Sequence, residues 1–241
     1  MLFNFILFFY ISLISQNEIF KKISIIGIAA SNDVNENDYF ETYIEYPEDM
    51  DSIGQGRNAF KQDTLKWPRG IIPYEISNEF KESERDTIIN ALKFFNEKTC
   101  IQVIPKQDEH KEYVFYKPGE GCGTMVGYNK LKSRPHEVVF NDYCIKLPEA
   151  IQHETMHVMG IFHEQCQIPK ILADSYDIEY DYNSLMHYGA TAFRKSGKNE
   201  TMRIKQRKGQ PTNEIKLGQL GYATKGDILK MNRMYHCSNF I

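Results

Sequence analysis

The stretch from position 153 to 163 constrains this chain most strongly, and it reads His-Glu-Thr-Met-His-Val-Met-Gly-Ile-Phe-His. In a helix, side chains four positions apart lie on one face, so His153 and His157 can bind the same ion. Gly160 permits a positive φ, which lets the helix end and brings His163 back as a third ligand. Three imidazoles leave the fourth position of a zinc ion open, as in catalytic sites. A surface helix with ordinary polar residues is the competing interpretation, and it leaves Gly160 and His163 unexplained.

Glu154 follows the first histidine of this motif. From there its carboxylate can reach a metal-bound water without occupying a ligand position. Such a carboxylate can take a proton from the water during attack on a carbonyl and pass it to the leaving amine. The sequence therefore predicts a Zn²⁺ cofactor, with Glu154 as the general base and then the general acid of a hydrolysis.

A second motif, Tyr-Asn-Ser-Leu-Met-His-Tyr-Gly, lies at positions 182–189. Together the two motifs form the metzincin pattern of metalloproteases. With Glu164 and Gln following the third histidine, the chain resembles the astacin family of zinc endopeptidases. The resemblance implies that Met186 forms a hydrophobic floor beneath the metal. It also implies that Tyr188 is a mobile fifth ligand that hydrogen-bonds the tetrahedral intermediate. Without the resemblance, both side chains would be read as core packing at a turn.

The pattern of apolar residues predicts strands near 71–76, 101–104, 113–116 and 137–140 and a helix near 83–99. A capping-box-like start at Thr224 predicts a C-terminal helix. The resemblance implies an α+β, metzincin-type catalytic domain with two lobes. Its N-terminal lobe would hold two long helices and a twisted, mostly parallel sheet with an antiparallel edge strand. Its C-terminal lobe would be irregular and would contain the C-terminal helix and the Met-turn, which is the turn at Met186 within positions 182–189.

In the same pattern, the strand at 122–126 is the edge of the sheet. An extended protein or peptide substrate is expected to pair with that edge by β-addition. The net charge of −3, with both signs interspersed, gives no electrostatic footprint for nucleic acid. A hydrophobic content of 41% allows a sizeable core and argues against a disordered chain.

The first residues suggest export from the cell. An almost unbroken apolar run at 2–14 is too short to span a bilayer comfortably but suits a secretory signal. We expect a signal peptide at 1–15, a secreted, extracellular protein and no membrane contact after signal removal; an uncleaved anchor is the alternative. The triplet Asn199-Glu-Thr is a glycosylation acceptor on this route.

The region 16–57 is expected to be a pro-segment, followed by the peptidase domain at 58–241. The resemblance implies that an activating protease cuts between Arg57 and Asn58. It further implies that the new amino terminus folds inward and reaches Glu164 through water. Positions 46–50 partly resemble a pro-segment motif whose Asp, here Asp49, binds the zinc and displaces the catalytic water. An acidic linker is the competing interpretation of this segment.

In a secreted chain, five cysteines are expected to form disulfides, although the sequence alone does not give their pairing. The resemblance implies the pairs Cys100–Cys237 and Cys122–Cys144. Cys166 has no counterpart in the family pattern, so it either carries a thiol or pairs with another chain.

One departure from the family pattern concerns the segment between His163 and Met186, which holds only 22 residues. Astacins carry a longer segment there, so the lower wall of the substrate cleft is expected to be shortened. The sequence therefore predicts a secreted zinc-dependent endopeptidase that hydrolyses internal peptide bonds and is made as a zymogen. The alternative is a secreted, non-catalytic zinc-binding protein that acts as a decoy or interaction partner.

Overall fold

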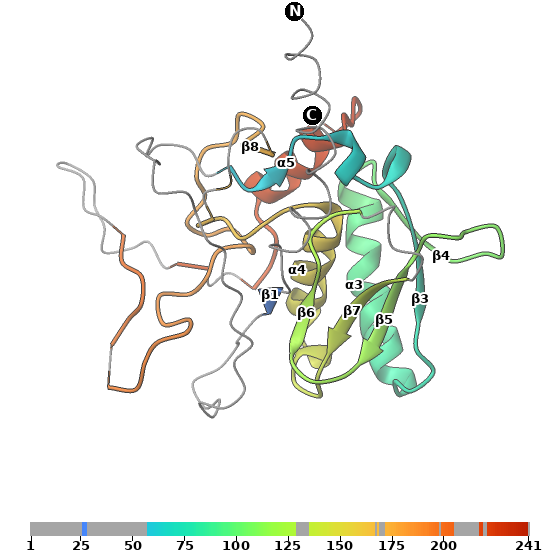
Figure 1. The fold of residues 1–241 in the computed structure, drawn as a ribbon, viewed down its shortest axis with the longest axis horizontal. Coiled ribbons are helices and arrows are strands. Elements are labelled where there is room, and N and C mark those ends of the chain that lie inside the picture. The colour runs from blue at the N-terminus through green and yellow to red at the C-terminus, as the bar shows by residue number, and fades with distance from the viewer. Residues whose placement is uncertain are drawn as a thin grey trace, which may run out of the picture.

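A computed structural model describes residues 26–27, 57–128, 135–166, 168, 172–197, 199–204, 217–218 and 221–240. The predicted signal peptide, Asp49 and almost all of the predicted pro-segment lie outside these residues. Among the described residues, none of the helices combines the length and apolar character needed to cross a bilayer. The described part is an α+β fold, as the sequence predicts (Figure 1).

The larger sheet has six strands in the order β1-β6-β7-β5-β3-β4. Their bounds are β1 Ile26–Gly27, β3 Ile71–Ile76, β4 Gln102–Pro105, β5 Val114–Pro118, β6 Cys122–Thr124 and β7 His136–Phe140. The strands β4, β3, β5 and β7 are parallel to one another, and β6 runs antiparallel to β7. The prediction of a mostly parallel sheet with an antiparallel strand beyond it is confirmed.

The outer side of β6 is paired with β1, in which Ile26 lies opposite Thr124 and Gly27 opposite Gly123. The strand β6, expected at the edge, is therefore the last strand contributed by the predicted peptidase domain, but β1 lies beyond it in the sheet. The added strand comes from the segment predicted to be removed on activation. Its position is visible beside β6 in Figure 1.

Two long helices, α3 (Glu82–Lys98) and α4 (Pro148–Met159), pack against each other behind the sheet (Figure 1). On α3, Ile88, Leu92 and Phe95 are buried, at the spacing of one helical face. The opposing strands contribute buried Tyr116 and Phe140, whose rings stack 6.3 Å apart. This core fixes α4, and with it the histidine motif, against the sheet.

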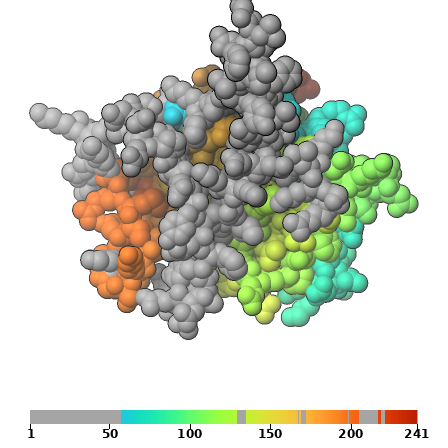
Figure 2. Space-filling model, viewed as in Figure 1, coloured from blue at the N-terminus to red at the C-terminus, as the bar shows by residue number. Residues whose placement is uncertain are grey.

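The C-terminal lobe contains little regular structure besides α5 (Lys225–Met234) among the described residues. A two-stranded sheet pairs β2 (Ala59–Phe60) with β8 (Ala173–Asp174). Short 3-10 helices at Asp63–Leu65, Pro68–Gly70 and Cys144–Lys146 connect the larger elements. In the space-filling view, the orange surface of this lobe lies across the molecule from the green and cyan surface of the N-terminal lobe (Figure 2).

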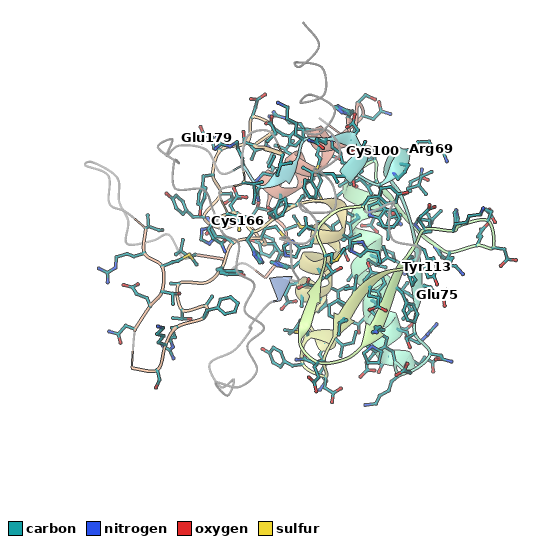
Figure 3. All side chains as sticks on the ribbon, in the orientation of Figure 1. Arg69, Glu75, Cys100, Tyr113, Cys166 and Glu179 are labelled. Carbon is teal, nitrogen blue, oxygen red and sulfur yellow. A yellow bond between two sulfur atoms is a disulfide. The ribbon has the colours of Figure 1, made fainter. Side chains whose placement is uncertain are left out.

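Two disulfides tie distant parts of the chain together. Cys100, just after α3, is bonded to Cys237, just after α5, and Cys122 at the start of β6 is bonded to Cys144. These are the pairs that the family resemblance implies. Cys166 belongs to neither pair and lies away from Cys100, in the C-terminal half (Figure 3).

Candidate metal centre

Three histidines converge at the end of α4. His153 and His157 lie on the helix and His163 follows it, and one nitrogen atom from each ring lies within 4.8 Å of the others. All three side chains are buried. The structure thus brings together the three residues that the sequence predicts as metal ligands.

Hydrogen bonds fix the orientation of two of these rings. Nδ1 of His153 lies 2.9 Å from the Leu185 carbonyl oxygen, and Nδ1 of His157 lies 2.7 Å from the Ile161 carbonyl oxygen. A carbonyl only accepts, so each Nδ1 carries the proton and each Nε2 keeps a lone pair. Such outer hydrogen bonds are typical of metal-binding histidines.

The Nε2 atoms of His153 and His157 lie 3.2 and 3.3 Å from Nε2 of His163. Nε2 of His153 and Nε2 of His157 have no proton to donate. A single N–H on His163 could therefore make a hydrogen bond to one of these two atoms but not to both. A divalent cation would satisfy all three lone pairs at once. The donor set therefore fits zinc better than it fits a hydrogen-bonded cluster.

Burial keeps these imidazoles neutral. It lowers the pKa of His153 to about 4, against the opposing effect of the hydrogen bond to Leu185. Burial also lowers the pKa of His157 and His163 well below the ordinary value, and the neighbouring imidazoles add to the effect. Zinc binds the neutral form of the ring, so all three imidazoles are in the metal-binding protonation state at physiological pH.

Glu154 is buried, and neither of its carboxylate oxygens has a hydrogen-bond partner among the described residues. Burial raises the pKa of this carboxyl group well above its ordinary value. A buried, unpartnered carboxyl group is costly unless a ligand satisfies it. A metal ion with its water would do so, because the positive charge favours the ionised carboxylate and the water can donate to it.

Gly160 ends α4 with a φ of 106°, in the left-handed region. Its N–H donates to the carbonyl groups of Met156 and His157. A Cβ at this position would lie 2.8 Å from Cε of Met234 and 3.1 Å from a ring carbon of Phe60. The backbone conformation therefore favours glycine, and any Cβ would force Met234 and Phe60 to shift; the resulting turn carries the chain to His163.

The Met-turn contacts both sides of the histidine cluster. The carbonyl oxygen of Leu185 accepts from His153, and that of Met186 accepts from the N–H of Glu164 at 2.9 Å. The Met186 side chain is fully buried. The ring of Tyr188 lies 4.2 Å from that of His163, measured between centroids. The structure thus places both residues at the centre, next to the predicted ligands.

Three buried polar side chains meet behind the third histidine. Oε2 of Glu164 accepts from Nζ of Lys230 at 2.6 Å and from Nδ2 of Asn58 at 2.7 Å. Oε1 accepts from the N–H of Asp181 at 3.1 Å. Burial raises the pKa of Glu164, and the charge of Lys230 opposes that shift. The sequence predicts Glu164 and the position of Asn58, but nothing in it indicates Lys230.

Asp227 is a second residue whose part in the site the sequence does not reveal. Its carboxylate accepts from the N–H of Thr224, closing the capping box of α5, as predicted. The same carboxylate also accepts from the hydroxyl of Ser184 at 2.6 Å and the N–H of Leu185 at 2.9 Å. A capping motif is readable from sequence, whereas its link to the Met-turn requires the tertiary structure.

Comparisons with known proteins agree with this geometry. The model of the peptidase family named Astacin matches residues 59–171 and 167–236, well over half of the chain. The two stretches overlap at residues 167–171, within the segment that is expected from the sequence to be short for the family. Zinc metalloproteinase nas-13 of Caenorhabditis elegans is 32% identical over 212 residues, covering 78% of this chain and 45% of the relative.

The low choriolytic enzyme of Oryzias latipes is 33% identical over 211 residues, which cover 75% of this chain and 74% of that enzyme. Among solved structures, high choriolytic enzyme 1, a hatching enzyme zinc-protease from Oryzias latipes, matches with a TM-score of 0.63 and 26% identity. The match covers 75% of this chain and all of that one. The zinc cofactor and the metzincin-type fold predicted from the sequence are confirmed, and the chain belongs to the astacin family of zinc metalloendopeptidases.

Proposed function

We propose that this chain is a secreted zinc endopeptidase that hydrolyses internal peptide bonds of extracellular proteins. The observation that carries the proposal is the cluster of three buried imidazoles beside a buried carboxyl group without a partner among the described residues. Metal binding alone requires only the imidazoles. Glu154 has a use only if a water molecule beside the metal must lose a proton.

His153, His157 and His163 would hold the ion. When bound, zinc supplies polarisation of the scissile carbonyl group and a lower pKa for its water. Glu154 accepts the proton of the attacking water on a carboxylate oxygen and delivers it to the leaving amine. The hydroxyl group of Tyr188 donates to the developing oxyanion, a contact that lowers the barrier because it strengthens as charge develops.

The substrate backbone is proposed to pair with the outer side of β6. In the uncut chain, Ile26 and Gly27 pair there with Thr124 and Gly123 in antiparallel register. These backbone groups can therefore accept an added strand, which supports their use by an extended substrate. Removal of the pro-segment would make the same groups available.

Latency is proposed to rest on the pro-segment at 16–57, with Asp49 on the metal and activation by a protease that cuts after Arg57. Secretion is proposed to depend on the signal peptide at 1–15. Asn199 is exposed, which supports its use as a glycan acceptor.

The test is digestion of casein by the full chain after limited trypsin treatment, with and without a chelator. We expect activity that the chelator removes and added zinc restores. Glu154→Gln should keep zinc and lower the rate by about 100-fold or more, because a general base contributes that much. The outcome against the proposal is stoichiometric zinc in the trypsin-treated protein without any proteolysis. That result would favour the decoy function suggested by the short segment after His163.

A further inference from the structure

Beneath the third histidine, the uncut chain already contains a complete buried ion pair. Lys230 and Glu164 are both almost fully buried, and their charged atoms lie 2.6 Å apart. Lys230 also donates to Oδ1 of Asn58 at 2.8 Å, and Asn58 donates to Glu164. Each of the three side chains thus binds the other two.

We propose that Lys230 is the positioning residue that supplies the positive charge for Glu164. The hydrogen-bonded cluster of Asn58, Glu164 and Lys230 then forms before cleavage after Arg57. It does not require the ammonium group of a new amino terminus. This inference rests on the proposed function, because it concerns how the same metal centre is assembled.

The first argument is the cost of an uncompensated charge. Glu164 immediately follows His163, and its N–H donates to the Met186 carbonyl oxygen, so any shift of Glu164 moves both the ligand and the Met-turn. A buried carboxylate is stable only with an opposite charge and hydrogen bonds. Lys230, Asn58 and the N–H of Asp181 provide these among the described residues, without any terminal amine.

The second argument is the place of Asn58 in the uncut chain. Asn58 is fully buried, and its carbonyl oxygen accepts from the N–H of Phe162. Its amide group donates to the Phe162 carbonyl oxygen at 3.0 Å. The next residues form β2, and Ala59 bridges to Ile161. The residue predicted to become the new terminus therefore occupies its buried position while Arg57 is still attached.

The third argument is electrostatic repulsion. Cleavage before Asn58 would create a second ammonium group on a residue that already accepts a hydrogen bond from the ammonium group of Lys230. Two positive charges near one carboxylate repel each other, and the repulsion is strong where water is excluded. Lys230 therefore makes the terminal charge unnecessary for Glu164.

The first experiment changes the amino terminus of the full chain. A site-specific protease sequence is placed so that cleavage leaves two residues, positions 56 and 57, before Asn58, and Arg57→Gln in this form prevents the natural cut. We expect the extended form to retain zinc and cleave casein within about threefold of the form that begins at Asn58. A loss of about tenfold or more, equivalent to about 1.4 kcal/mol, would overturn the inference, because it would show that the terminal amine is required.

The second experiment removes the charge of Lys230. Lys230→Gln in the full chain should transfer zinc to a chelator about tenfold faster and lower the melting temperature by about 10 °C. Lys225→Gln changes an exposed lysine of the same helix and should change neither quantity. Identical behaviour of the two variants would contradict the role of Lys230.

A third variant distinguishes the loss of the ion pair from a general failure of Lys230→Gln to fold. The double change Glu164→Gln with Lys230→Gln removes both charges and should melt at a higher temperature than Lys230→Gln alone, because no unpaired carboxylate remains. If the double variant is no more stable, the ion pair is not what Lys230 provides. Zinc transfer and melting do not depend on proteolysis, so an inactive wild-type protein would refute the proposed function and leave this inference decidable.

Discussion

At the residue scale, the chemistry of the site follows from what burial does to each group. The three imidazoles are kept neutral, and two of them are oriented by backbone carbonyl groups. Glu154 is held beside them without a protein partner among the described residues. Neutral nitrogen ligands and an unsatisfied acid are what a metal-activated water requires.

Zinc release by acid is expected to have its midpoint below pH 6.5. Protons compete with zinc for the Nε2 atoms, and a lowered pKa delays that competition to a lower pH. Histidine has an ordinary pKa of 6.5, and burial lowers the pKa of His153 to about 4. Metal analysis after dialysis at a series of pH values measures the midpoint, and circular dichroism at each pH separates release from unfolding. Release at or above pH 6.5 would contradict the pKa shifts.

Tyr188→Phe is expected to lower kcat by about 100-fold with little change in KM, because an oxyanion donor acts mainly in the transition state. Zinc content should be unchanged, since the three imidazoles remain. Tyr182→Phe is the matched control: Tyr182 lies in the same motif, and its ring packs on Tyr180 at 4.9 Å. Steady-state kinetics on a peptide substrate decides the matter. An equal loss in both variants would assign Tyr188 to packing alone.

At the scale of elements, the site depends on where α4 ends. The sharp turn at Gly160 places His163 opposite the two ligands of the helix. The turn is held from the other lobe, because Phe60 and Met234 fill the space where a side chain would lie. The position at which α4 ends therefore depends on the packing of β2 and α5 against Gly160.

Gly160→Ala should reduce the free energy of unfolding by about 2–5 kcal/mol, combining left-handed strain with overpacking. Gly197→Ala is the control: its φ is 77° and nothing lies within 4 Å of its Cβ position. That variant should lose only about 1–2 kcal/mol, the strain of the backbone. Urea denaturation measures both, and equal losses would show that the contacts with Phe60 and Met234 are unimportant.

The elements with strong local patterns are those that the sequence predicts. The apolar face of α3 and the strand at 71–76 have the periodicities of their structures, and the histidine motif defines its own helix. The cluster of Asn58, Glu164 and Lys230 has no such pattern, because its members lie 66 to 172 positions apart in sequence. Only the folded chain brings them together.

At the scale of the whole molecule, two disulfides connect parts of the chain that are distant in sequence. Cys100–Cys237 spans 137 positions and joins the end of α3 to the residues after α5, whereas Cys122–Cys144 spans 22 positions within the N-terminal lobe. The long link joins the end of α3 to residues that come after the metal centre and the Met-turn in the chain.

Removing the long link should therefore cost more stability than removing the short one. Loop-closure entropy gives about 5 kcal/mol for Cys100→Ser with Cys237→Ser and about 3 kcal/mol for Cys122→Ser with Cys144→Ser. Denaturation of each double variant in urea compares the two. A larger loss for the short link would indicate that native contacts near β6, rather than chain entropy, determine the cost.

The pairing of β1 with β6 bears on how the proposed block of the substrate-binding strand would be released. While Ile26 and Gly27 belong to the same chain as β6, they compete with any peptide at the high local concentration of a tethered segment, on the order of millimolar. A cut after Arg57 followed by dilution reduces that concentration to the bulk value. The backbone pairs described for β1 then lose the advantage of the tether, so an extended substrate strand at higher concentration would replace Ile26 and Gly27 on β6.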